Sequence, residues 1–156
     1  MSENFNRMVR LADEFFAAKQ DSGQLDVTQE VIEKLESLHP STLSEEVEGD
    51  GPVVWVLLIP TSQATMDRFI AGRIGERQLL EQTLPGGKYD ALYLCSVLVL
   101  PEFRRQGRAY RTAERAVASI LNDHPIRILY TWNFSSEGKA LAHRLAERFD
   151  LPLLER

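Results

Sequence analysis

The chain has 156 residues, of which 44% are hydrophobic and 26% charged, as in an ordinary globular domain with one core. Its net charge of −5 argues against bulk attraction to nucleic acid or to an anionic membrane surface. The only cysteine, Cys95, excludes an intrachain disulfide and a cysteine-based metal site and fits a reducing compartment. The sequence has no apolar run of the roughly 18 residues that a membrane span needs and no signal-peptide pattern. We therefore expect a single cytoplasmic domain over residues 1–156 that holds no metal.

Two amphipathic helices are predicted within residues 1–40. Ser2 can cap the first, whose apolar positions recur at helical spacing: Phe5, Met8, Val9, Ala12, Phe15 and Phe16. Asp26 and Gln29 resemble a capping box for the second, which we expect to end at His39, before a proline. The expected role of this pair is to cover one face of a sheet, and a wall of the substrate site is the alternative.

Residues 41–51 are polar, acidic and rich in turn-forming residues, which predicts an exposed connection. Their carboxylates could instead attract a cationic substrate. The next run, residues 53–59, is the most strand-like of the first half, and we expect Pro60 to end it because proline cannot donate to a sheet ladder.

Helix is predicted between this strand and the next one. Ser62 can cap a first helix that carries Met66 and Phe69 at helical spacing, and residues 76–84 can form a further turn or two. Residues 85–87, Pro-Gly-Gly, then form a clear turn.

The most informative stretch is residues 94–110. Residues 97–100 form a continuous apolar run typical of a strand covered on both faces, and Pro101 ends it. Gly107 then precedes an amphipathic helix that extends to residue 122. A strand–turn–helix unit of this kind points free backbone N–H groups and the positive end of the helix dipole at one spot. Four arginines surround that spot against the acidic background, which predicts a small phosphate site: Arg104, Arg105, Arg108 and Arg111.

The last part of the chain predicts a strand at residues 126–132, an amphipathic helix and a short final strand within residues 151–154. Strands that alternate with helices indicate an α/β fold.

The segment 104–109, Arg-x-x-Gly-x-Ala, after a Val-x-Pro-x-Phe strand end resembles the acyl-CoA pyrophosphate loop of the GCN5-related N-acetyltransferases (the GNAT superfamily). The resemblance covers residues 93–121 and extends to 154. It implies an α/β fold with a mixed central sheet that is flanked by helices and splayed between two parallel strands, here residues 93–100 and 126–132. Acyl-CoA would enter the wedge between them, so the acyl-CoA-binding half is residues 88–154. Most members join the preceding strands by short hairpins, and this chain departs from them by inserting helix.

The resemblance also implies which residues contact the acyl-CoA. The strand edge would pair with the pantetheine arm, and one of its main-chain amides would polarise the thioester carbonyl as an oxyanion hole does. The loop would wrap the pyrophosphate mainly through main-chain amides. The cofactor-binding candidates are accordingly Val97, Leu98, Val99, Arg104, Arg105, Gln106, Gly107, Arg108 and Ala109.

The acid–base residues are less evident. Related enzymes often use a tyrosine on the last helix as the acid, and the positions that match it here are Ala146 or Arg144. His143 could substitute for it, with a surface histidine as the alternative interpretation. Several members carry a carboxylate that acts as the base at the position that Tyr93 occupies here. Tyr93 itself could relay protons through water, or it could be an ordinary strand tyrosine.

Three other side chains lie near these positions. Glu76 and Glu81, on the inserted segment, are placed where they could face the acceptor. Cys95 could be imagined as a nucleophile, but a lone thiol in an apolar strand is expected to belong to the core.

Two functional hypotheses follow. The first is an acyl-CoA-dependent N-acyltransferase that moves acetyl, or another short acyl group, from acetyl-CoA to a primary amine by direct attack. Its partners would be acetyl-CoA as co-substrate and a small-molecule or peptide amine as acceptor, without nucleic acid or membrane, and a homodimer stays open. The second is a module that binds or senses CoA or acyl-CoA without turnover.

Overall fold

The computed structural model describes residues 2–18, 28–132 and 135–156. The helices are α1 (Glu3–Ala18), α2 (Gln29–Leu38), α3 (Gln63–Ile70), α4 (Glu76–Gln82), the short 3₁₀ helix η1 (Pro101–Phe103), α5 (Arg108–Asp123) and α6 (Ser136–Phe149). The strands are β1 (Leu43–Glu48), β2 (Gly51–Thr61), β3 (Ala91–Val99), β4 (Ile128–Thr131) and β5 (Leu153–Glu155). The expected α/β class is confirmed.

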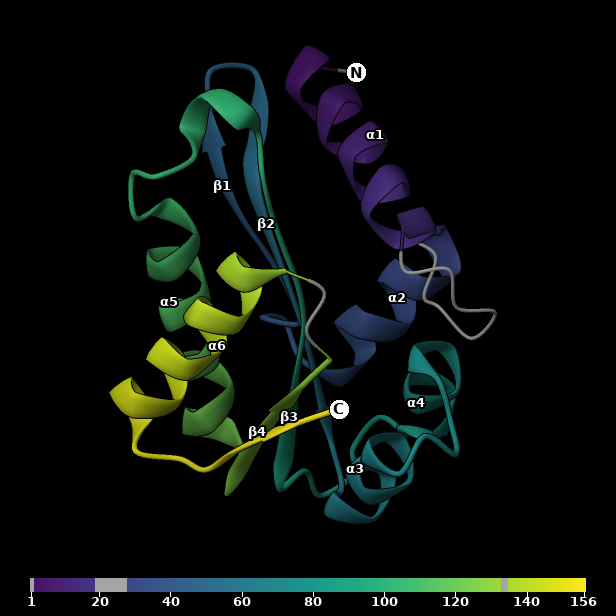
Figure 1. Ribbon diagram of the computed structural model, residues 1–156. Coiled ribbons are helices and arrows are strands. Elements are labelled where there is room, and N and C mark those ends of the chain that lie inside the picture. The colour runs from purple at the N-terminus through teal and green to yellow at the C-terminus, as the bar shows by residue number, and fades with distance from the viewer. Residues whose placement is uncertain (1, 19–27, 133–134) are drawn as a thin grey trace.

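The strands of the described chain form one open sheet in the order β1-β2-β3-β4-β5. β1, β2 and β3 are antiparallel neighbours, whereas β3, β4 and β5 are parallel, so the sheet is mixed. Parallel strands need crossover connections, and α5 and α6 supply them. Figure 1 shows α5 and α6 on one side of the sheet and α1 to α4 on the other.

β3 is longer than its parallel partner. β4 pairs with it only from Ala91 to Leu94, while β3 continues to Val99 along β2. A bulge lies where the two separate, because Leu58 of β2 faces Leu94 and the preceding Leu57 faces Ser96. Cys95 is the extra residue, and such an insertion bends the strand and increases its twist. The edge of β3 beyond Leu94 therefore has no strand partner in the described chain.

The prediction that residues 41–51 form an exposed connection was wrong, because most of them belong to β1. Contacts that are distant in the sequence hold this strand. The Trp55 indole N–H donates to Glu45 at 3.0 Å, and the Arg108 guanidinium forms ion pairs with Glu46 and Glu48. The acidic side chains that suggested a solvated loop are partners for an indole and a cation on neighbouring elements.

The prediction that Pro60 ends its strand was also wrong. Pro60 lies inside β2, opposite Leu92 of β3. On the other side of β2 the last contact is the main-chain bond from Leu58 N to Thr42 O, at 2.8 Å. Pro60 comes two residues later on that same edge, where no described strand needs its missing N–H, and prolines are tolerated at such edges.

The helix boundaries follow their caps. The Ser2 hydroxyl accepts from the Phe5 N–H, and Ser62 and Ser135 cap α3 and α6. α2 is capped by Thr28, whereas Asp26 of the expected capping box lies outside the described residues. The expected strand–turn–helix unit is confirmed as β3, η1 and α5, and the inserted helices as α3 and α4.

The helices of the first 40 residues cover one face of the sheet, as expected. The Phe5 ring of α1 meets the Trp55 ring of β2 edge-on at 5.9 Å, and Leu35 of α2 is almost fully buried. On the other face, the apolar stripe of α5 is buried on the sheet: Ala113, Ala116, Val117 and Ile120. Together with the strands these side chains form one hydrophobic cluster.

Candidate functional site

A cavity of about 710 Å³ lies beside the open edge of β3. Its walls come from β3, from the face of β2 at Val56 and Leu58, from the loop before α5, and from α6. Phe15 of α1 also lines it, although α1 covers the opposite side of the sheet. The cavity therefore reaches through the gap that opens where β3 and β4 stop pairing.

The main chain of β3 offers hydrogen-bonding groups to this cavity. Leu100 N donates to Val53 O at 3.0 Å, so residues 98 and 100 bond to β2. Because the bonded residues alternate along an antiparallel pair, the N–H and C=O groups of Val97 and Val99 point to the open edge. Both residues line the cavity. Leu98, also predicted to bind, does not line it and is buried at 6% exposure.

The loop between η1 and α5 has an unusual backbone. Arg105 and Gly107 both have left-handed dihedrals, with φ of 63° and 73°. For a residue with a side chain, this conformation costs about 1–2 kcal/mol. Turns of this kind aim successive N–H groups at one point and form anion-binding concavities. The first N–H groups of α5 lie beside it and have no acceptor within their own helix.

The arginines of this loop have different environments. Arg108 lines the cavity, but its guanidinium is occupied by the carboxylates of Glu46 and Glu48. Arg104 donates from Nε to Val99 O at 3.0 Å. Arg105 lines the cavity and makes no hydrogen bond or ion pair with any described residue. Arg105 is thus the loop cation that is available to a ligand.

Gln106 of the motif and Arg111 of α5 point away from the cavity. Gln106 does not line the cavity, and its side chain bonds to Glu102 O and accepts from Arg108. Arg111 donates to Gln106 O at 3.0 Å and also lies outside the cavity. Their contacts close the loop onto itself and onto α5.

Arg144 of α6, one of the two positions that match the family's tyrosine, lines the cavity, and its contact with Tyr110 was not predicted from the sequence. Its guanidinium lies over the Tyr110 ring, 3.7 Å from the centroid, and among the described residues it has no ion-pair partner. The Tyr110 hydroxyl donates to Glu114 at 2.8 Å, and this bond raises the pKa of Tyr110. Its place in the sequence could have indicated that it borders the apolar face of α6, because Arg144 follows Leu141 by three residues.

Neither predicted catalytic residue lines the cavity. Tyr93 is fully buried, and its hydroxyl donates to Glu76 Oε2 at 2.6 Å. Burial, and then the nearby Glu76 carboxylate, raise the pKa of Tyr93 well above its ordinary value. His143 is exposed on α6, and its Nε2 lies 2.8 Å from Glu155 Oε1. The geometry supports a structural role for Tyr93 and a surface role for His143.

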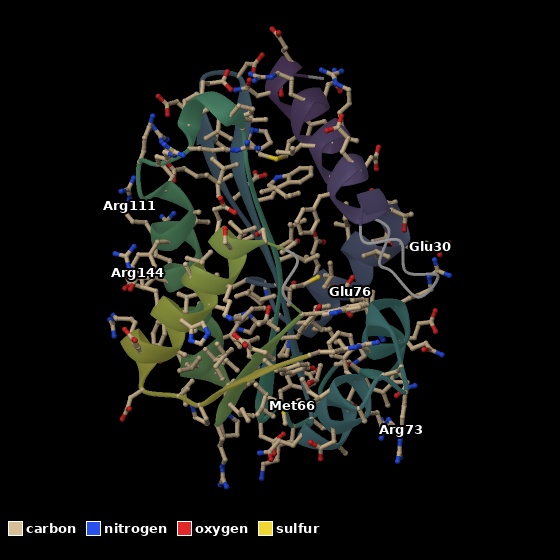
Figure 2. The ribbon with its side chains drawn as sticks, in the orientation of Figure 1. Glu30, Met66, Arg73, Glu76, Arg111 and Arg144 are labelled. Carbon is tan, nitrogen blue, oxygen red and sulfur yellow. The ribbon has the colours of Figure 1, made fainter. Side chains whose placement is uncertain are left out.

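Glu76, which the sequence placed where it could face the acceptor, does not line the cavity, whereas Cys95 does. Glu76, the first residue of α4, is fully buried, and Figure 2 shows it between α4 and the sheet, across the sheet from Arg144. Cys95 is buried, as expected of a core thiol, and it also lines the cavity. Its Sγ is 3.4 Å from Glu76 Oε2. Glu81, in contrast, is exposed on α4.

The described residues define an α/β protein with a mixed open sheet and a cavity that carries cations on one wall and main-chain donors on another. Within them, no cluster of three or more His, Cys, Asp or Glu side chains is arranged to hold a metal ion. None of the described helices has the length and apolarity to cross a bilayer. In comparisons with known proteins, no family model matches the chain, and neither curated proteins nor solved structures gave a match.

Proposed function

We propose that the protein is an acyl-CoA-dependent N-acyltransferase with a GNAT-like fold. It would transfer acetyl, or another short acyl group, from CoA to a primary amine by direct attack. The observation that carries the proposal is a single one: the cavity beside the open edge of β3 is continuous with the loop at residues 104–109. One ligand with a diphosphate at one end and an amide-containing arm at the other matches both.

The loop suits a diphosphate. The N–H groups at the start of α5 and the guanidinium of Arg105 can bond several phosphate oxygens at once. Charge-assisted hydrogen bonds contribute about 1.5–3 kcal/mol each, whereas a helix dipole adds only about 0.3–1 kcal/mol. The directed bonds are therefore the main source of affinity.

The open edge of β3 suits the pantetheine arm. That arm carries two amide groups, and the main-chain N–H and C=O of Val97 and the N–H of Val99 can bond to them as a neighbouring strand would, while Arg104 already occupies the Val99 carbonyl. An N–H held in the same way beside the thioester carbonyl would stabilise the charge that develops on its oxygen. A preorganised donor of this kind is worth about 10²–10³ in rate.

A second candidate function is a module that binds or senses acyl-CoA without turnover. The specific observation in its favour is that Tyr93 and His143 both lie outside the cavity. Amine acylation needs a neutral amine and a protonated leaving thiol, and neither of these two residues is placed to transfer those protons.

Binding does not separate these two functions, because both require it. The test is a screen of diamines, amino acids, aminated antibiotics and lysine peptides with acetyl-CoA, followed by thiol release and by the mass of the acylated product. Turnover of an amine that is lost with Gly107→Asp supports the acyltransferase. Binding of acetyl-CoA with no turnover of any acceptor contradicts it and favours the sensing module.

A further inference from the structure

A buried cluster of three acidic groups lies next to the cavity. Glu76 Oε2 accepts from the Tyr93 hydroxyl at 2.6 Å and from the Cys95 thiol at 3.4 Å. Glu76 and Tyr93 are fully buried, and Cys95 is 5% exposed. A buried oxygen that accepts two such bonds is suited to carry the negative charge of the cluster.

Cys95 is the member of the cluster that reaches the cavity. It is the extra residue of the β3 bulge, at the point where pairing with β4 ends. It lines the cavity, while Glu76 and Tyr93 do not. A proton that moves from the cavity to the Glu76 carboxylate can therefore pass through the thiol.

Among the described residues, a second phenol and a guanidinium lie near the cluster. Burial raises the pKa of Tyr93 and also that of Tyr130, whose ring lies 5.1 Å from the Tyr93 ring. Both phenols therefore stay protonated near neutral pH. Arg156 approaches from beyond β5, and its guanidinium bonds to Ile74 O at 3.0 Å, just before α4 begins.

We propose that Glu76 accepts the proton of the incoming amine and that the Cys95 thiol relays it. This inference rests on the proposed function. An ammonium in the cavity gives one proton to the Cys95 sulfur while the thiol proton passes to Glu76, so the thiol is restored and the amine is neutral. The amine then attacks the thioester, the carbon–sulfur bond breaks, and the second amine proton goes to the departing CoA thiolate. Glu76 later returns its proton to solvent.

The first test does not need turnover. Cys95 is the only cysteine, so the mass of an iodoacetamide adduct reports this thiol alone. Glu76→Gln removes a negative charge 3.4 Å from Sγ and should move the midpoint of the alkylation rate to lower pH by about one unit, or about tenfold at pH 7.5. Glu81→Gln removes the same charge from an exposed site on the same helix and should leave the midpoint unchanged. If the substitution only changes the access of iodoacetamide to the thiol, the limiting alkylation rate at high pH changes, whereas the pH midpoint of the rate does not.

The second test uses an amine that the protein acylates. Glu76→Gln should lower kcat by about 10²-fold at pH 7 with KM for acetyl-CoA little changed, and the deficit should shrink as the pH approaches the pKa of the free amine. Cys95→Ala should cost as much, Cys95→Ser should retain activity within about tenfold, and the Glu76→Gln/Cys95→Ala double variant should be no worse than either single one. Glu81→Gln is the matched control.

The outcomes separate the relay from the proposed function. If Glu76→Gln does not move the pH midpoint of alkylation, the proposed coupling between Glu76 and the Cys95 thiol is overturned. A wild-type kcat at pH 7 in Glu76→Gln or in Cys95→Ala overturns it as well. Either result leaves the acyltransferase itself standing. A shifted midpoint without turnover of any amine overturns the acyltransferase, and the relay with it.

Discussion

Replacing Arg105 by glutamine perturbs the ligand site with little expected effect on the fold. The Arg105 side chain is exposed and makes no bond or ion pair with a described residue. Surface substitutions of this kind usually change the free energy of unfolding by no more than about 0.5 kcal/mol. Glutamine also keeps a side chain at this left-handed position, so the strain of the loop is unchanged.

The effect on binding should be much larger. If Arg105 contacts the diphosphate, its loss removes at least one charge-assisted hydrogen bond, worth about 1.5–3 kcal/mol. The Kd for CoA should then rise about 10- to 150-fold, since each 1.4 kcal/mol is about a factor of ten.

Isothermal titration calorimetry with CoA and acetyl-CoA, at one fixed salt concentration, measures this change. Arg115→Gln is the matched control, because Arg115 is an exposed arginine of α5 that does not line the cavity. Its Kd should stay within about twofold of wild type, since surface charges away from the site contribute little. Equal Kd values for the two variants would refute the assignment of the phosphate site.

Four further predictions concern residues whose contacts are now defined. Arg108→Gln should lower the free energy of unfolding by about 1–3 kcal/mol in urea titrations, because it leaves two β1 carboxylates without their cation; an unchanged midpoint would contradict this. Tyr93→Phe should destabilise by about 1–3 kcal/mol without changing the Kd for acetyl-CoA, whereas His143→Gln should leave kcat unchanged. The hydrogen bond from Arg7 lowers the pKa of Glu102 from 4.5 to about 2, so this pair stabilises fully above pH 4.5 and loses its effect as the pH falls toward 2. The stability difference between wild type and Arg7→Gln should shrink over that range in acid titrations followed by circular dichroism, and a constant difference would argue against it.

The sequence predicted best where structure is local. The run that became β3, the proline of η1 and the glycine before α5 are neighbours in the chain, and short-range sterics and periodicity determine them. β1 was missed because what stabilises it is distant: Arg108 is 62 residues from Glu46. From the sequence alone the β1 carboxylates are expected to be solvated, because the cation that pairs with them comes from a distant part of the chain.

The candidate site divides in the same way. The loop around Gly107 was found because its motif is contiguous. The contributions of Phe15, Arg144 and Glu76 come from three different helices, and only the tertiary arrangement brings them to the cavity or beside it. A one-residue bulge turns Cys95 toward both Glu76 and the cavity, and periodicity alone does not predict an inserted residue.

A crystal structure of the protein with CoA bound tests the central claim most directly. We predict the diphosphate at residues 104–109, with Arg105 in contact, and the pantetheine arm along Val97 and Val99. The thiol end should lie in the gap between β3 and β4, near Cys95. CoA bound at another surface, or an empty cavity at saturating CoA, would contradict the proposed acyl-CoA site.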